Sequence, residues 1–161
     1  MNVRDLHQTV DGIAMPGQEP KGVIPGLRDQ SRERRVLIVA LDDVIPAAVP
    51  AANVLVIAPA LNSRLRQWLS DEDAARLRAE ERVTAFVAWL ENMGVRAKGQ
   101  VGDADPLLAI ADALPTFPAD EIMVAAQPEG LNRFADELVS RAHNRFALPV
   151  SRTSEPLAKA A

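Results

Sequence analysis

The chain has 161 residues, 48% of them hydrophobic and 25% charged, which is typical of one globular domain with a sizeable core. The formal net charge is -4, so binding to nucleic acids or to membrane surfaces through general electrostatics is not expected. Cysteine is absent and histidine occurs at two positions, which excludes disulfides, thiol catalysis and a histidine-rich metal cage. The N-terminal stretch lacks the apolar run of a signal peptide, and no run reaches transmembrane length, so we expect a soluble cytoplasmic protein.

Glycines and prolines recur through residues 1–33 at a spacing that breaks any long helix or central strand. We therefore expect a flexible tail over 1–33. A folded α/β domain is expected over 34–153, followed by a short tail over 154–161.

Continuous apolar runs predict strands that are buried on both faces, as in a parallel sheet. These runs are Val36–Leu41, Val54–Ala58 and Ile122–Ala126. Asp42 and Asp43 end the first of them. Pro46 and Pro50 interrupt the link to the second run, so a full crossover helix does not fit and a helical turn or a bare loop is expected.

Helical periodicity predicts helices over residues 71–93, 106–114 and 133–146. The apolar stripe expected for the first of these helices consists of Ala74, Leu77, Val83, Phe86, Val87 and Leu90. Asp105 and Asn132 are the N-cap candidates of the second and third helices, and Pro106 suits a first helical position. The alternating segment 95–101 and the short segment 149–153 have the character of edge strands.

Strands that alternate with helices predict a three-layer α/β fold with a five-stranded parallel sheet. Placing the continuous runs inside and the mixed ones at the edges gives the strand order 3-2-1-4-5. In such sheets ligands bind outside the carboxyl ends of the strands, at the point where the order reverses. The candidate ligand positions are therefore Asp42, Asp43 and the stretches 58–63, 102–105 and 125–130.

Over residues 35–153 the chain resembles the universal stress proteins, which share the adenine nucleotide alpha hydrolase-like fold. The resemblance rests on Val101-Gly102-Asp103 before the second helix, Ala119-Asp120 before the fourth strand and Pro149-Val150 in the fifth strand. Asp42 is similar in position to an aspartate that contacts adenine in that family. The resemblance implies ATP or AMP as ligand, and a homodimer joined along the last strand.

The chain departs from the glycine motif of ATP-binding members, Gly-x2-Gly-x9-Gly-Ser/Thr. Ala125 stands at its first glycine, Pro128 or Glu129 near the second, and Asp136-Glu137 at the final Gly-Ser. Two carboxylates would repel phosphate, and without glycine the backbone cannot approach it closely. We therefore expect weak ATP or AMP binding, or none.

Several candidate residues have an ordinary structural interpretation beside the functional one. Asp42-Asp43 can end a strand as readily as contact a ligand, and Ala125-Ala126 with Ser151-Arg152 do not supply the partners of a magnesium-binding receiver domain. Asp103 and Asp105 fit capping better than metal binding or acid–base chemistry. Arg64 and Arg66 could clamp a small anion or lie on a solvated helix. The candidate nucleotide- or anion-binding residues are Asp42, Ala58, Asn62, Ser63, Arg64, Arg66, Gly102, Asp103, Ala125, Gln127 and Gly130.

Two hypotheses for the function stay open. One is a stress-response adaptor that is not an enzyme, acts as a homodimer on an unknown protein partner and binds little or no ATP. The other is a sensor that binds a nucleotide or small anion in the cleft at the strand ends. No nucleophile–base pair or metal-binding pattern is visible in the sequence, so catalytic and metal-ligating residues are not expected.

Overall fold

The computed structural model describes residues 33–46, 49, 53–61, 72–128, 130 and 132–154. Strands and helices alternate along this part of the chain, except that no described helix separates the first two strands. In chain order the elements are β1 (Arg35–Ala40), β2 (Asn53–Pro59), α2 (Glu72–Asn92), β3 (Arg96–Gly102), α3 (Pro106–Ala113), β4 (Glu121–Ala125), α4 (Arg133–Phe146) and β5 (Val150–Thr153).

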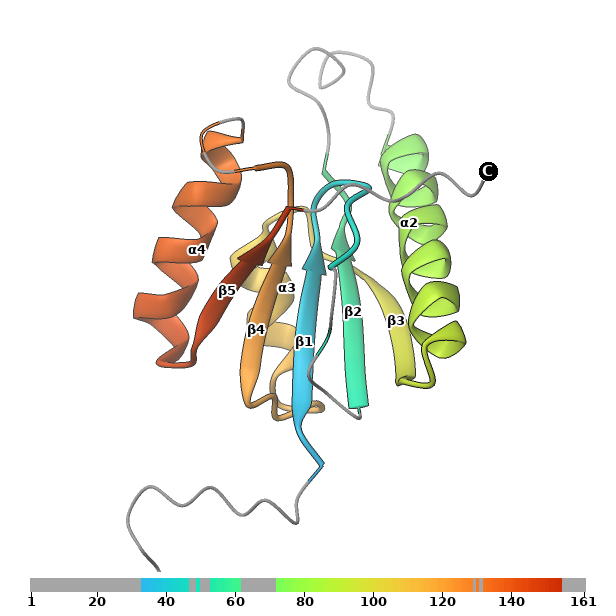
Figure 1. Ribbon diagram of the computed structural model, residues 1–161. Helices are drawn as coiled ribbons and strands as arrows, with labels where there is room; N and C mark the ends of the chain where they lie inside the picture. Colours follow the sequence, from blue (N-terminus) through green and yellow to red (C-terminus); the bar gives the residue numbers. More distant parts are fainter. Residues whose placement is uncertain are drawn as a thin grey trace, which may run out of the picture. The chain divides into compact units, whose positions relative to one another are not determined.

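The strands form one parallel five-stranded sheet in the order β3-β2-β1-β4-β5, which confirms the predicted order (Figure 1). The predicted interior strands β1, β2 and β4 are buried along nearly their whole length, whereas β3 and β5 lie at the two edges. The order reverses between β1 and β4. Both the interior strands and the reversal point are therefore where the apolar runs indicated.

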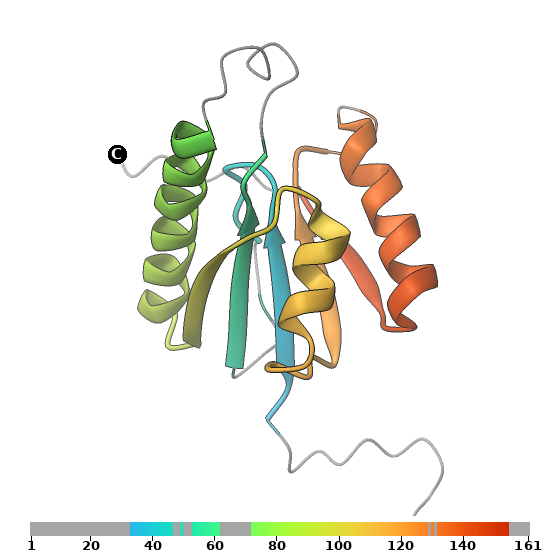
Figure 2. The ribbon, with the colours of Figure 1, turned by 180° about the vertical axis from the view of Figure 1, so that it is seen from behind.

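One face of the sheet is covered by α2, and the opposite face by α3 and α4 (Figures 1 and 2). Side chains alternate in direction along a strand. In β1, those of Val36, Ile38 and Ala40 therefore face α2, and those of Leu37 and Val39 face the opposite side of the sheet. The two apolar layers thus share the same three central strands. None of the described helices is long and apolar enough to cross a membrane.

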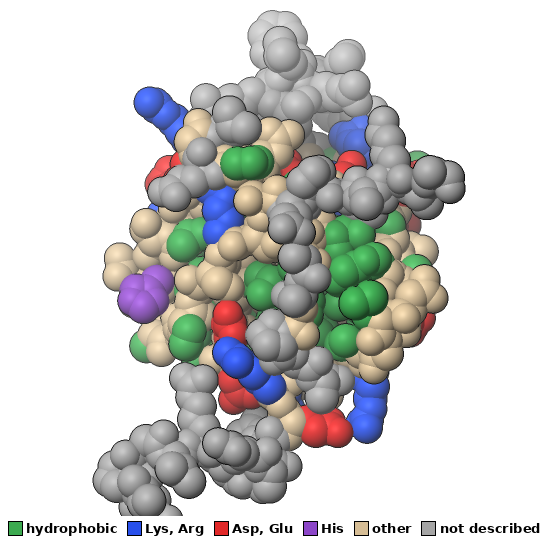
Figure 3. All heavy atoms as spheres, in the orientation of Figure 1, with side chains coloured by type: hydrophobic (Ala, Val, Ile, Leu, Met, Phe, Trp, Pro, Cys, Tyr) green, Lys and Arg blue, Asp and Glu red, His purple; other side chains and the backbone are tan. Residues whose placement is uncertain are grey.

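The link between β1 and β2 contains no helix among its described residues, 41–46 and 49. Pro46 is buried there, and Val49 packs against the apolar layer on the α2 side. The described part of the link therefore agrees with the expectation, drawn from the prolines, that a full crossover helix does not fit here. Figure 3 shows this face, where hydrophobic side chains gather beside α2 and described charged groups of both signs lie mostly toward the periphery.

Helix α2 packs through a stripe that differs in part from the predicted one. The buried positions are Ala75, Ala79, Val83, Phe86 and Leu90. Leu77 was expected in this stripe but is 57% exposed, so that prediction was wrong. The physical reason is the small size of the alanines, which bring the first half of the helix close to the sheet without needing a leucine.

Two glycines permit close packing of helices on β3. A Cβ built on Gly99 would lie 2.1 Å from Val83 Cγ1, and one built on Gly102 would lie 2.6 Å from the Cβ of Ala109. Neither distance is possible for real atoms, so α2 and α3 occupy the space that these glycines leave. The glycine at position 102, the last residue of β3, therefore has a packing explanation.

The amino-terminal edge of the sheet is tied together by Glu121, which the sequence interpretation missed. Its Oε2 accepts a hydrogen bond from Arg34 Nη2, and its Oε1 accepts one from the Ser151 hydroxyl at 3.0 Å. The Glu121 side chain is only 12% exposed. A buried carboxylate with two partners links the start of β4 to β5 and to the segment before β1.

Candidate functional site

The candidate site is the carboxyl edge of the sheet between β1 and β4, where Asp42 follows β1. The Asp42 Oδ2 accepts hydrogen bonds from the backbone N–H of Gln127 at 2.9 Å and from Asn132 Nδ2 at 3.1 Å. The backbone N–H of Asp42 itself donates to the carbonyl oxygen of Ala125 at 3.2 Å. Asp42 therefore joins the end of β1 to the loop that follows β4.

The neighbouring carboxylate of Asp43 is used elsewhere. Its Oδ1 accepts a hydrogen bond from Arg82 Nε of α2 at 3.0 Å, and the Asp43 side chain is 77% exposed. The two aspartates thus bind partners on different sides of the sheet. Among the described residues no group of three or more acidic or histidine side chains could hold a metal ion, so a receiver-type magnesium pair finds no support there.

An arginine on β5 holds the same loop from the opposite side. Arg152 Nη2 donates to the carbonyl oxygens of Gln127 and of Pro128, the latter at 3.1 Å. Its Nη1 pairs with Asp136 Oδ1 in the first turn of α4. The other oxygen, Asp136 Oδ2, accepts the backbone N–H of Gly130 at 3.3 Å.

These residues form one closing network, defined here as Asp42, Gln127, Asn132, Asp136 and Arg152. In it each of the two aspartate carboxylates accepts from a backbone N–H of the loop and from a side chain. The Arg152 side chain is 13% exposed and that of Asp136 is 33% exposed. The groups best suited to bind an anion here, a guanidinium and loop N–H groups, are thus already bound to carboxylates of the same chain.

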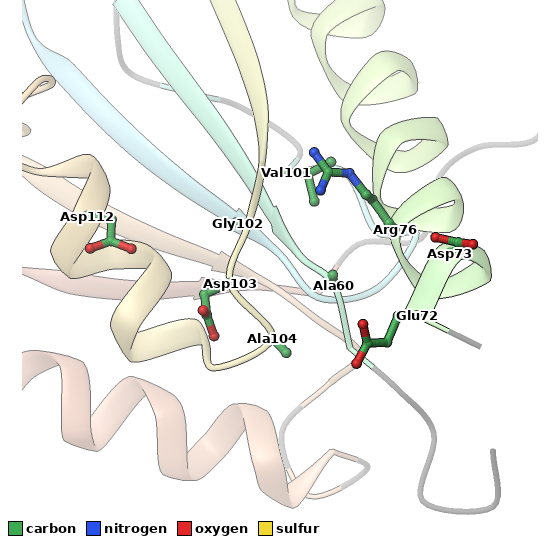
Figure 4. A pocket seen from close by; sticks show the side chains of 9 residues that line it. All are labelled: Ala60, Glu72, Asp73, Arg76, Val101, Gly102, Asp103, Ala104 and Asp112. Carbon is green, nitrogen blue, oxygen red and sulfur yellow. The ribbon is translucent and has the colours of Figure 1, made fainter. Parts of the chain in front are cut away.

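A separate pocket of about 530 Å³ lies at the ends of β2 and β3 (Figure 4). Its walls come from the first turns of α2, the loop between β3 and α3, and α3. The lining residues are Ala60, Glu72, Asp73, Arg76, Val101, Gly102, Asp103, Ala104 and Asp112. Four of these side chains are acidic and one is basic, so the pocket disfavours polyphosphates.

The other candidate binding residues that the structure describes differ in their burial and hydrogen bonds. Ala58 and Ala125 have no exposed surface, so neither side chain can contact a ligand from solution. Asp103 Oδ1 accepts the backbone N–H of Asp105 at 2.8 Å, and Asp105 caps α3 by accepting the N–H of Leu107 at 2.9 Å. Gly130 has φ of +85°, a backbone conformation that favours glycine.

The predicted anion clamp falls outside the described residues. This applies to Asn62, Ser63, Arg64 and Arg66, and also to Glu129 of the altered glycine motif. Small-anion binding by the two arginines therefore stays a prediction. Of the candidate residues, the structure brings Asp42, Gln127 and Gly130 together at the loop after β4, while Gly102 and Asp103 line the other pocket.

Sequence reasoning missed Arg152 and assigned Asn132 to capping alone. Asn132 does cap α4, because its Oδ1 accepts the N–H of Ala135 at 3.1 Å. Its amide nitrogen is then free to donate to Asp42, a contact between residues 90 positions apart. The sequence offered one sign of the Arg152 contacts, namely an arginine in a short edge strand together with an aspartate in the first turn of the preceding helix. This pattern is too weak to predict an ion pair by itself.

Comparison with solved structures finds a universal stress protein family protein from Arabidopsis thaliana with AMP bound. The two chains are 15% identical, with a TM-score of 0.47, and the match covers 79% of this chain and 95% of that one. No protein-family model matches the chain, and no curated protein matches it. The strand order described above is the one predicted from the sequence, and it fits the fold of universal stress proteins.

Proposed function

We propose that this chain is a stress-response adaptor that is not an enzyme, acts as a homodimer joined along β5, and binds ATP weakly or not at all. The observation that carries the proposal is the closing network at the point where the strand order reverses. Its carboxylates and guanidinium are bound to one another and to the loop after β4, rather than presented to a ligand.

The charges around the site support the part of the proposal that concerns ATP. A triphosphate at the start of α4 would meet the Asp136 carboxylate, which already holds Arg152 and the Gly130 N–H. An anion would have to displace a carboxylate that is tethered within the same chain, and it gains no new donor by doing so. Among the described residues that line the acidic pocket beside β3, a triphosphate would meet one cation, Arg76, and four carboxylates.

The geometry of β5 supports the proposed dimer. The carbonyl oxygens of Pro149 and Thr153 accept from the backbone N–H groups of Ile122 in β4 and of Ala126 directly after it. Because backbone groups alternate in direction along a strand, those of Val150 and Arg152 point to the open edge. No described strand pairs with β5 on that side. An unpaired edge of this kind is a template for strand addition by a second copy.

The opposite edge is a poorer candidate for pairing between copies. On β3 the side chains of Arg96 and Lys98 are exposed, so two β3 strands side by side would bring like charges together. On β5 the one charged side chain, Arg152, is turned inward and neutralised by Asp136. Self-association through β5 therefore meets no charge repulsion from the strand itself.

Sedimentation equilibrium of the full chain tests the proposed dimer. Val150→Pro removes an outward N–H and should give a monomer at concentrations where the wild type is dimeric. Val150→Ala is the matched control, because it loses similar packing but keeps the N–H and should remain dimeric. A wild type that is monomeric at tens of micromolar, about the range for a weak interface, contradicts the proposal.

Titration with small anions distinguishes the sensor hypothesis from the adaptor proposal. Titration with AMP and with inorganic phosphate should show no binding if the adaptor proposal is right. Binding that falls with salt and disappears in Arg64→Ala/Arg66→Ala would favour the sensor instead. The adaptor proposal would then fail even if the dimer were found.

A further inference from the structure

Strand β5 is both the open edge of the sheet and an anchor of the loop at the candidate site. The loop group is defined here as Gln127, Pro128, Gly130 and Asn132, the described residues between Ala126 and α4. Arg152 of β5 contacts two of their carbonyl oxygens, and its partner Asp136 binds the N–H of a third. A single edge-strand side chain therefore holds most of the loop group.

The second anchor of the loop group comes from the sheet interior. Asp42, after β1, accepts from the Gln127 N–H and the Asn132 amide. Between the two anchors the backbone N–H of Ala126 donates to the Thr153 carbonyl oxygen at 3.1 Å, which continues the pairing of β4 with β5 up to the loop. The loop group thus spans from β1 to the edge strand.

We propose that Arg152 makes the β5 edge and the loop group one cooperative unit, so that binding of a partner strand at the edge and the conformation of the loop are linked. The link to partner binding rests on the proposed dimer. Linkage of this kind is reciprocal: whatever stabilises the ordered loop must favour edge pairing by the same factor, and the reverse. The conformation of the candidate site would then depend on whether a partner strand is bound at β5, and no nucleotide would be needed.

The chemistry of arginine explains why one side chain can do this. Its planar fork donates several hydrogen bonds in fixed directions, and here it reaches a carboxylate and two carbonyl oxygens on different segments. The Nε of Arg152 is buried and has no hydrogen-bond partner among the described residues, so its binding depends on the two Nη atoms. A lysine ammonium at this position cannot satisfy all three acceptors from one point.

Amide hydrogen exchange measured by NMR, together with sedimentation equilibrium, tests this proposal on the full chain. Gln127 and Gly130 N–H report on the loop group. Ile122 and Ala126 N–H, which donate to carbonyl oxygens of residues 149 and 153, report on β4–β5 pairing. The variants are Arg152→Met and Arg152→Lys. Arg141→Met is the matched control, because it removes an exposed arginine whose described ion-pair partner is Glu137 on the same helix, α4.

In Arg152→Met we expect both reporter pairs to exchange about tenfold faster or more, and the dimer to dissociate about tenfold more readily. Arg152→Lys should fall between this variant and the wild type, and Arg141→Met should match the wild type. Faster exchange in the loop pair alone, with the β4–β5 pair and the dimer unchanged, overturns the proposal but leaves the proposed dimer standing.

Two further outcomes are also decisive. If the wild type is monomeric, the proposed dimer is wrong. Joint opening of both reporter pairs in Arg152→Met then supports the cooperative unit, and opening of the loop pair alone overturns it. If Arg152→Met does not fold, Asp136→Asn and Arg152→Lys are compared by the same measurements, since each weakens the ion pair without emptying the position.

Discussion

Replacing Asp42 and Asp43 separately by alanine distinguishes a structural carboxylate from a free one. The two aspartates are adjacent in sequence but differ in their surroundings. Asp42 is half-buried and accepts two hydrogen bonds that join β1 to the loop after β4. Asp43 is 77% exposed and makes one ion pair with Arg82. If the Asp42 carboxylate stabilises the fold, replacing it should lower the free energy of unfolding clearly, whereas replacing Asp43 should change it little.

The expected magnitudes follow from these contacts. Hydrogen bonds to a charged group contribute about 1.5–3 kcal/mol each. Because Asp42 is half-buried we take the lower value, which gives about 3 kcal/mol for Asp42→Ala. An exposed ion pair contributes about 0–1 kcal/mol, the range expected for Asp43→Ala.

Urea unfolding followed by far-ultraviolet circular dichroism measures both variants. With an m-value of about 1.5–2 kcal/mol/M, the midpoint of Asp42→Ala should fall by about 1.5–2 M and that of Asp43→Ala by about 0.5 M or less. Asp42→Asn keeps one acceptor oxygen and should lie between the two. Equal midpoints for Asp42→Ala and Asp43→Ala, both near the wild type, would refute the structural role of Asp42.

Three further changes test other parts of the fold by urea unfolding. Gly102→Ala should lower the unfolding free energy by about 1–3 kcal/mol, because the new Cβ meets Ala109; an unchanged midpoint would show that α3 shifts freely. Phe86→Ala should cost about 3–5 kcal/mol at the contact of α2 with the sheet, and a loss below about 1 kcal/mol would contradict that packing. Glu121→Ala should cost about 1–2 kcal/mol, the low end for a buried carboxylate because Arg34 stays solvated, and Arg34→Ala should cost at least as much because it leaves the buried Glu121 carboxylate without its cation.

The sequence was informative where side-chain burial follows a simple period. Three continuous apolar runs correctly placed β1, β2 and β4 in the interior, and their contrast with 95–101 and 149–153 led to the correct strand order. The helix bounds were predicted within one residue, and for α3 and α4 this is because Asp105, Pro106 and Asn132 mark the helix starts by local chemistry.

The site was harder to predict because its contacts are not local. The Asn132 and Asp42 side chains meet across 90 positions, and Arg152 reaches Gln127 across 25. No periodicity encodes such pairs. The position of Asp136 in the altered glycine motif pointed to the start of α4, but not to the arginine that neutralises it. Asn62, Ser63, Arg64 and Arg66 lie outside the described residues, so that part of the prediction is open to experiment alone.

Isothermal titration calorimetry of the wild type with ATP and magnesium tests most directly the claim that the candidate site is filled by the chain's own groups. We expect no binding with a dissociation constant below roughly 100 micromolar, which corresponds to about 5.5 kcal/mol. A low-micromolar constant that is abolished in Asp42→Ala would contradict this claim, because it would show that the Asp42 carboxylate serves a nucleotide rather than Gln127 and Asn132.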